Sequence, residues 1–339
     1  MKFDMSQVAR IGIDKLVLSG IKVESNRNST ITEGQGWIEE KLELKEELFS
    51  IVKSIKLYET GEMVEANYLR FNPNRLLHGH NISNARAPEL KKAVDLLIQK
   101  LGSKGISVDI TDAKISEIEI NINIEAKFEE YKEVLILLFL KLPNLRKIGN
   151  LTLGKAYKKL FTDSTLDGGW QNHGVRAYDK RREVSDETVL SFDLLRIEWW
   201  LSSSSYKYYA SKFDRDNILS SLLEDCDVLD LIFMDLCINK LFKGAYKYLE
   251  EEIIPELERA YLDFKKTNRE AANKGKNPKR NVYKYLEENY WIFDYSYLIE
   301  IVSKHDKKNR KREMERIKTN YSRYSNKQIL AELVERIMK

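Results

Sequence analysis

Tyr178 is followed directly by a charged run, Asp-Lys-Arg-Arg at residues 179–182. A phenol has an ordinary pKa of about 10, so it is a poor nucleophile at neutral pH unless its surroundings favour the phenolate. Neighbouring cations favour it, and the same cations can pair with phosphate oxygens. The pattern indicates a tyrosine nucleophile for a phosphodiester, with Lys180 as its catalytic partner and Arg181 and Arg182 on adjacent phosphates. The alternative is a surface tyrosine beside a solvated run of charge.

A second tyrosine has a similar basic setting. Tyr157 lies within the sequence Lys-Ala-Tyr-Lys-Lys at residues 155–159. Because the chain has 18 tyrosines, the local pattern does not choose between Tyr157 and Tyr178. Tyr157 is therefore the alternative nucleophile.

Two of the four histidines, His78 and His80, are separated by a single glycine. Residues two apart in a strand point to the same face, so both imidazoles could bind one cation. A carboxylate on a neighbouring strand would complete the site, and Glu119 and Glu117 are candidates, with Glu198 behind them. Such a set suits Mg²⁺ or Mn²⁺ better than a structural zinc, which favours cysteine. The alternative is a turn in which both histidines are exposed.

The elements that must position these residues alternate between strands and helices. Gly61 separates two alternating segments, 52–60 and 62–72, which predict a hairpin. Residues 37–50 mix charge and leucine at helical spacing, although a strand also fits them. The remaining predictions are strands at 11–23, 114–125, 174–178 and 196–200, and helices at 88–102 and 127–141. This order predicts an α+β fold in which an antiparallel sheet carries helices on one face.

The sequence changes character after residue 205, and the pattern becomes helical nearly to the end of the chain. A chain of 339 residues also exceeds what one hydrophobic core usually fills. We therefore expect two domains, residues 1–205 and an all-helical domain at residues 206–339.

Basic residues are concentrated late in the chain. Residues 264–324 hold 17 Lys and Arg against 8 Asp and Glu, whereas the whole chain has a net charge of only +4. The segment predicts contact with a polyanion. The alternative is a solvated helical face rich in lysine.

Composition narrows the class of protein. Hydrophobic residues make up 42% of the chain, yet no run of 18 or more apolar residues is present, so no membrane span is expected. The two cysteines, Cys226 and Cys237, form neither a CxxC motif nor a disulfide framework. We expect a cytoplasmic protein.

Three stretches together resemble a known family, the rolling-circle replication initiators of the filamentous-phage gene II type with their plasmid and phage relatives. The first is the box NPNRLLHGHN at residues 72–81. The second is Glu-Ile-Glu at residues 117–119, where the family has Arg-Ile-Asp. The third is Tyr-Asp-Lys at residues 178–180, followed by Leu-Arg-Ile-Glu at residues 195–198. The resemblance covers roughly residues 10–201, and Ile-Asp-Lys-Leu at residues 13–16 is similar to the family's first strand.

The resemblance implies an HUH-type endonuclease fold, a divalent metal, and site-specific nicking of single-stranded DNA at a replication origin through a 5′-phosphotyrosine. It places the nucleophile on Tyr178 rather than Tyr157, the family histidine on His80, and the family acid on Glu119. His78 stands where the family often has glutamine, and it would extend the metal site. The expected contacts to DNA are made by Arg75, Arg176, Arg181, Arg182 and Arg196.

The resemblance also implies partners beyond the origin DNA. A host polymerase would extend the free 3′-hydroxyl, and a host helicase would be needed because the chain has no Walker A motif. The helical domain would bind duplex DNA, contact that helicase or pair with a second copy as a homodimer. Two alternative functions remain, a conjugative relaxase and an origin-binding protein whose nuclease site has decayed.

Overall fold

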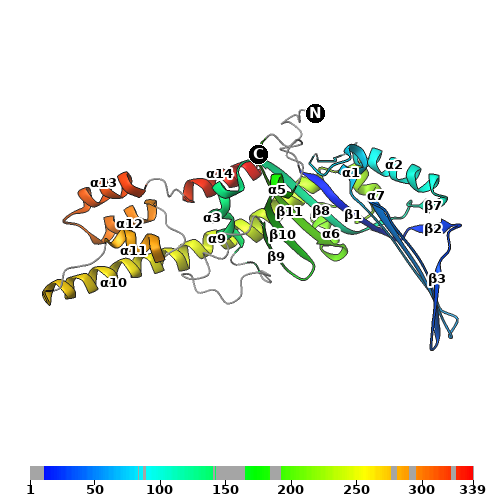
Figure 1. The fold of residues 1–339 in the computed structure, drawn as a ribbon, viewed down its shortest axis with the longest axis horizontal. Coiled ribbons are helices and arrows are strands. Elements are labelled where there is room, and N and C mark those ends of the chain that lie inside the picture. Colours follow the sequence, from blue (N-terminus) through cyan, green and yellow to red (C-terminus); the bar gives the residue numbers. More distant parts are fainter. Residues whose placement is uncertain are drawn as a thin grey trace. The chain divides into compact units, whose positions relative to one another are not determined.

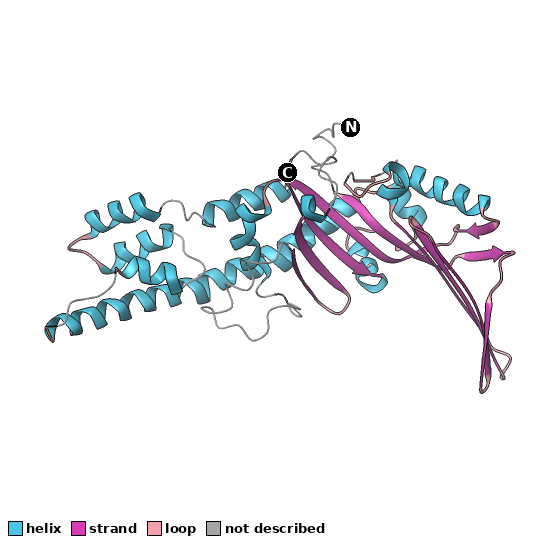
Figure 2. Cartoon of the chain, in the orientation of Figure 1, coloured by secondary structure: helices cyan, strands magenta, loops and turns pink. Residues whose placement is uncertain are grey.

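A computed structural model gives the fold of the chain (Figures 1 and 2). It describes residues 11–82, 84–86, 89–139, 142, 165–183, 192–275, 281–289, 295–321 and 326–338. Within these ranges the chain forms a large sheet together with many helices. The α+β class expected from the sequence, with a helical C-terminal region, is confirmed.

The main sheet has nine strands in the order β3-β4-β5-β6-β1-β8-β11-β10-β9, and the strand pairings recorded for it are antiparallel. A separate two-stranded ribbon pairs β2 (Lys22–Ser25) with β7 (Ile106–Asp109). The strands of the main sheet are β1 (Gly12–Ser19), β3 (Thr30–Gly34), β4 (Trp37–Lys45), β5 (Phe49–Tyr58), β6 (Met63–Phe71), β8 (Lys114–Glu125), β9 (Thr165–Gly169), β10 (His173–Asp179) and β11 (Leu194–Ser202).

The hairpin predicted around Gly61 is present as β5 and β6. Gly61 has a φ of 80°, a left-handed conformation that a residue without Cβ adopts most easily. The helical alternative for residues 37–50 is wrong, because β4 and the start of β5 occupy this segment. Their leucines, Leu42 and Leu44, are buried at strand spacing, while the residues between them are exposed.

One face of the sheet is apolar and the other is polar. Trp199 of β11 is opposite Ile120 of β8, and both side chains are fully buried. Alternation along β11 then places Arg196 and Glu198 on the opposite face. The neighbouring strand β10 sets Tyr178 opposite Arg196 and Arg176 opposite Glu198, so this polar face is where the chemistry of the sequence collects.

The chain divides into two compact units. The first holds residues up to Glu125 together with Gly169–Asp235, and the second holds Ala126–Gly168 and Leu236–Lys339. This division does not coincide with a boundary at residues 205 and 206, because α6 follows β11 without a break and residues 126–168 group with the C-terminal helices. The expected pair of domains therefore stays a prediction about folding units.

The helices belong to both units. Those up to residue 125 and from 169 to about 235 are α1 (Pro73–His78), α2 (Glu89–Ser103), α5 (Lys180–Glu183), α6 (Ser203–Ser211), α7 (Leu219–Glu224) and α8 (Val228–Leu236). The second unit holds α3 (Phe128–Phe139), α9 (Lys243–Tyr248), α10 (Ile254–Asn273), α11 (Val282–Asn289), α12 (Tyr295–His305), α13 (Arg310–Tyr321) and α14 (Asn326–Met338), with π-helical turns at Cys237–Phe242 and Leu249–Ile253. Among the residues described here, no helix is both long and apolar enough to cross a bilayer.

Candidate functional site

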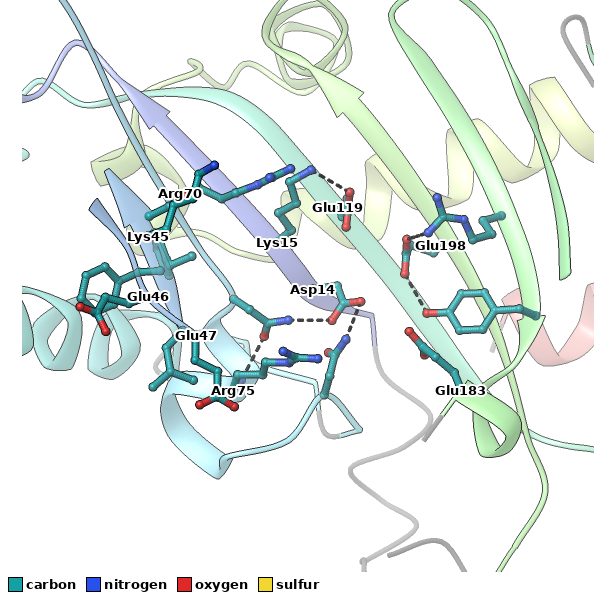
Figure 3. Close-up of a pocket in the computed structure, with 18 residues that line it drawn as sticks. Asp14, Lys15, Lys45, Glu46, Glu47, Arg70, Arg75, Glu119, Glu183 and Glu198 are labelled. Atoms are coloured by element: carbon teal, nitrogen blue, oxygen red, sulfur yellow. Dashed lines mark hydrogen bonds and ion pairs between the residues drawn. The ribbon is translucent and has the colours of Figure 1, made fainter. Parts of the chain in front are cut away.

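A pocket of about 460 Å³ opens on the polar face of the sheet (Figure 3). It is lined from β1, β4, β5, β6, β8, β10 and β11 and from the first turn of α1. Its charged and hydroxyl-bearing lining comprises Asp14, Lys15, Lys45, Glu46, Glu47, Ser50, Arg70, Arg75, Glu119, Arg176, Tyr178, Glu183 and Glu198. Most strands of the main sheet thus contribute residues to the pocket.

Three carboxylates meet in this pocket. One oxygen from each of Asp14, Glu119 and Glu198 lies within 4.8 Å of the other two, a spacing at which one cation could be bound by all three. Asp14 and Glu198 are buried, and Glu119 is partly exposed. The sequence predicted Glu119 as the acid of the site, with Glu198 behind it as a further candidate, and did not identify Asp14.

Asp14 reaches the pocket because β1 is irregular at this position. The register of β1 against β8 shifts between Ile13 and Lys15, so Asp14 has no direct partner in the ladder. Strict alternation would place Asp14 on the same face as the buried Leu16. A bulge re-aims a side chain, and it allows Asp14 and Lys15 to line the same pocket although they are consecutive.

The asparagines of the NPNRLLHGHN box hold Asp14 in place. Asn72 Nδ2 donates to Asp14 Oδ1 at 3.4 Å, and Asn81 Nδ2 donates to Asp14 Oδ2 at 3.1 Å. Asn72 Oδ1 also accepts from the Arg75 backbone N–H at 3.0 Å and so caps α1. In this structure the box contributes amides that orient an acid of the site.

Arg196 also holds Asp14 in place, although it does not line the pocket. Its guanidinium is fully buried, pairs with Asp14 at 3.2 Å, and donates to Asn123 Oδ1 at 2.7 Å and to the Ile82 carbonyl at 3.2 Å. The positive charge of Arg196 holds the pKa of Asp14 below its ordinary value, although burial opposes this. Arg196 is fully buried and donates to three groups inside the protein, which does not fit its predicted contact with DNA.

Replacing Arg196 by methionine should lower the free energy of unfolding by about 3–5 kcal/mol, because Asp14 would be left as an unpaired buried charge. Urea unfolding followed by circular dichroism measures the change. The double variant with Asp14→Asn should be less destabilised than the sum of the two single variants. Additive effects would show that the two side chains are not coupled.

Tyr178 is buried, with 5% of its surface exposed, and its hydroxyl donates to Glu198 Oε2 at 3.1 Å. Burial is the largest cause that raises the pKa of this phenol well above its ordinary value, and the Glu198 carboxylate raises it further, while Arg196 opposes both. The phenol is therefore protonated at neutral pH in this state. It needs a proton acceptor, and Glu198 already occupies that position.

The cations after Tyr178 do not surround its hydroxyl. Lys180 is buried, pairs with Glu183, and lies over the Tyr178 ring with its Nζ 5.6 Å from the ring centroid. Arg181 pairs with Asp193 at 3.0 Å, and Arg182 with Asp179 at 3.3 Å. The expected phenolate among cations is replaced by a phenol beside a carboxylate. Arg181 and Arg182 are exposed and do not line the pocket.

Other cations line the pocket instead. Lys45, Arg70 and Arg75 are exposed, and Arg176 is partly exposed with its Nη1 3.5 Å from Glu198 Oε1. The predicted DNA contacts Arg75 and Arg176 are thus brought to the site. Lys45 and Arg70 were not identified from the sequence. Their only signal is a cation near the end of a strand, β4 for Lys45 and β6 for Arg70.

His78 and His80 belong to the box but do not line the pocket. His78 ends α1, and Gly79 follows with a φ of 74°, so the two histidines flank a helix end rather than lying in a strand. Their rings stack with centroids 5.7 Å apart, and Nδ1 of His80 accepts from the Ile82 backbone N–H at 3.4 Å. Burial, and then the nearness of His78, lower the pKa of His80. A metal role for this pair stays a prediction.

The residues of the pocket suit a hard divalent cation. All three clustered side chains offer carboxylate oxygens, which Mg²⁺ and Mn²⁺ prefer. Asn121 of β8, opposite Glu198 in the ladder, is fully buried, and neither of its amide atoms has a hydrogen-bond partner. A buried orphan amide next to the cluster is what a metal-bound water would satisfy. Lys15 Nζ, at 3.0 Å from Glu119 Oε1, now neutralises part of the acidic charge.

Glu198 gives the cluster a dependence on pH. Burial, and then the charges of Asp14 and Glu119, raise the pKa of Glu198 to about 8. Between the unfolded value of about 4.3 and 8 the folded protein holds an extra proton, so its stability should fall as pH rises, by at most about 1.4 kcal/mol per pH unit. Thermal or urea unfolding in EDTA across pH 5–9 measures this slope.

The variant Glu198→Gln should flatten the dependence of stability on pH. Mg²⁺ should bind more tightly toward pH 8, because the ion displaces the proton of Glu198. A slope that Glu198→Gln leaves unchanged would assign the proton to another group.

The alternative nucleophile, Tyr157, lies outside the described residues. Its position relative to the carboxylates is therefore not compared with that of Tyr178.

Comparison with known proteins gives a similarity to a solved structure. No protein-family model matches the chain, and no curated protein matches it. The chain is similar to the rolling circle replication initiator protein from Geobacillus stearothermophilus, with 15% sequence identity and a TM-score of 0.33 over 68% of this chain and 85% of that chain.

Proposed function

We propose that this protein nicks and rejoins one strand of DNA at a replication origin, through a covalent bond between Tyr178 and a 5′-phosphate, and so initiates rolling-circle replication. The observation that carries the proposal is the shared pocket of the Tyr178 hydroxyl and the carboxylates of Asp14, Glu119 and Glu198. A nucleophile next to an acidic cluster, with cations around it, fits the cleavage of a phosphodiester.

The residues of the pocket have distinct roles in the proposed reaction. Once Glu198 has lost its own proton, the Tyr178 oxygen attacks the phosphorus, and the phenol proton passes to the Glu198 carboxylate along the hydrogen bond that already joins them. The bond from phosphorus to the 3′-oxygen breaks, and this oxygen leaves and takes up a proton as a free 3′-hydroxyl. The phosphodiester energy is kept in the tyrosine–phosphate bond, so a later attack by a 3′-hydroxyl rejoins the strand.

Two groups of residues would stabilise the phosphate in this reaction. Mg²⁺ or Mn²⁺, when bound by the three carboxylates, would neutralise charge that develops on the phosphate oxygens. Lys45, Arg70, Arg75 and Arg176 line the pocket and would hold the strand on either side of the scissile phosphate. Single-stranded DNA is the expected substrate, because the phosphodiester must enter the pocket to meet a buried phenol.

The partners proposed with this function are origin DNA, a host polymerase that extends the 3′-hydroxyl, and a host helicase. A second copy of the chain is a further candidate partner. A cytoplasmic location follows from the function, because the DNA substrate and these host enzymes are found there.

The test is formation of a covalent adduct. The protein is incubated with Mn²⁺ and a supercoiled plasmid that carries the DNA around its own gene, then denatured with detergent. We expect relaxed plasmid with protein bound to the 5′ end of the nicked strand and a free 3′-hydroxyl that a polymerase extends. Full relaxation without an adduct would mean hydrolysis, and intact plasmid with specific binding would mean an origin-binding protein without nuclease activity.

A further inference from the structure

The turn between α12 and α13 carries a dense group of cations. Residues 307–312 read Lys-Lys-Asn-Arg-Lys-Arg, and all six are exposed. We call this segment the basic corner. It belongs to the second unit, whereas the pocket belongs to the first, so the proposed reaction does not account for it.

The acidic residues next to the basic corner face inward. Asp306 pairs with Lys265 of α10 at 3.0 Å and caps the turn by accepting from the Asn309 backbone N–H at 3.3 Å. Glu313 is buried and accepts a hydrogen bond from the Tyr283 hydroxyl at 2.8 Å. Asp306 and Glu313 therefore make contacts within the unit, whereas the cations of the basic corner are exposed on its surface.

The cations of the basic corner are not neutralised by neighbours. Within the described part of the chain, Lys307, Lys308, Arg310 and Lys311 form no ion pair, and Arg312 is 3.8 Å from the buried Glu313. Five like charges on six residues repel one another. This repulsion is relieved when a polyanion binds, which is the usual basis of salt-sensitive attachment to nucleic acid.

The α12 side of the turn is fixed to α10. Glu258 of α10 pairs with Lys304 at 2.7 Å and with His305, and Lys265 of the same helix pairs with Asp306. These contacts join the end of α12 to α10, so little conformational entropy is lost when the neighbouring cations bind a ligand.

We infer that the basic corner binds the phosphate backbone of double-stranded DNA. DNA as the polyanion rests on the proposed function. Residues 304–318 contain no Phe, Tyr or Trp on which single-stranded bases could stack. None of them is an exposed large hydrophobic residue that would anchor the segment in a membrane. Backbone contact without readout of sequence is the mode that remains.

The experiment compares wild type with the variant in which Lys307, Lys308, Arg310 and Lys311 are all alanine. Binding to a fluorescent 20-base-pair duplex of arbitrary sequence is measured by anisotropy between 50 and 200 mM salt. We expect the dissociation constant to rise by about 10-fold or more, and the slope of log K against log salt to fall by about 3–4, since each phosphate contact contributes about 0.9. The control neutralises three exposed lysines of the same unit, Lys243, Lys266 and Lys274, and should change both quantities little.

The outcomes separate this inference from the proposed function. Adduct formation on a short single-stranded oligonucleotide should be the same for wild type and the alanine variant, because Tyr178 and the carboxylates are intact. Equal duplex affinity and equal slope for the two proteins would overturn the inference and leave the nicking proposal standing. Loss of duplex binding in a protein that never forms the adduct would support the corner and reject the nicking proposal. Equal loss of binding to phosphatidylserine vesicles and to duplex would mark a general anion surface and would also overturn it. A matching thermal melt for both proteins confirms that the variant is folded.

Discussion

Replacing Tyr178 by phenylalanine is expected to abolish the covalent protein–DNA adduct and to lower strand cleavage by at least about 10⁴-fold. The substitution removes one oxygen and keeps the buried ring, over which Lys180 lies. The hydrogen bond to Glu198 is lost, which costs about 1 kcal/mol of stability and leaves the fold intact. Binding to single-stranded DNA should change little, because the cations that line the pocket remain.

The measurement uses an oligonucleotide labelled at its 3′ end, so that the label follows the 5′-phosphate onto the protein. Wild type should give a labelled band of the protein's mass plus the cleaved fragment on a denaturing gel, and Tyr178→Phe should give none. Tyr157→Phe is the matched control and should form the adduct as wild type does. An adduct that survives in Tyr178→Phe and disappears in Tyr157→Phe would move the nucleophile to Tyr157.

The regular elements of the sheet were predictable because their pattern is local. Strict alternation over residues 114–125 predicted β8, and a glycine between two alternating segments predicted the hairpin of β5 and β6. These signals depend on residues within a few positions of one another, and tertiary contacts reinforce them here. The helical interpretation of residues 37–50 failed because Ile38 and Leu42 are four apart, as are Leu44 and Leu48, and this spacing imitates a helical repeat over a short segment.

The residues missed at the site depend on contacts that are distant in sequence. Asp14 reads as one polar residue in an apolar strand, and only the irregular register between β1 and β8 turns it into the pocket. Arg196 reads as a surface cation, yet its partner Asp14 is 182 positions away. Burial of that pair is set by the assembled sheet, and no local pattern shows it. The bulge and the buried pair are therefore the two features that sequence reasoning had no means of finding.

The character of the tyrosine was also beyond the sequence. The run Asp-Lys-Arg-Arg at residues 179–182 indicated a phenol among cations, but its three cations form ion pairs with acids of their own segment or with Asp193. The alternation of β10 and β11 places a carboxylate next to the hydroxyl instead. The structure thus sets a carboxylate, rather than cations, beside this hydroxyl.

The carboxylate cluster predicts that Glu119→Gln will shift the Mn²⁺ dependence of cleavage to higher concentrations. Glu119 supplies one of three clustered oxygens, and its loss removes a full negative charge from the binding set. At fixed metal, the cleavage rate should fall by about 10²- to 10³-fold, the scale of losing one electrostatic contact to the transition state. Raising the Mn²⁺ concentration should recover part of the rate, because the variant binds the ion less tightly and does not lose the nucleophile. The metal titration is followed by adduct formation and, independently of activity, by isothermal titration calorimetry with Mn²⁺.

Glu117→Gln is the matched control for this variant. Glu117 lies two positions away on β8 and pairs with the same Lys15, but it does not line the pocket. Glu117→Gln should bind Mn²⁺ as wild type does. A loss of Mn²⁺ affinity equal to that of Glu119→Gln would mean that general negative charge, not a defined site, attracts the ion.

The variant His80→Ala tests whether this histidine is also a metal ligand. Nδ1 of His80 already accepts a hydrogen bond from the Ile82 backbone N–H, and the ring does not line the pocket. We therefore expect a smaller loss of Mn²⁺ affinity than in Glu119→Gln. A shift as large as that of Glu119→Gln would show that the histidine joins the carboxylates around the metal, and the site would then need α1 and the turn after it to move toward the sheet.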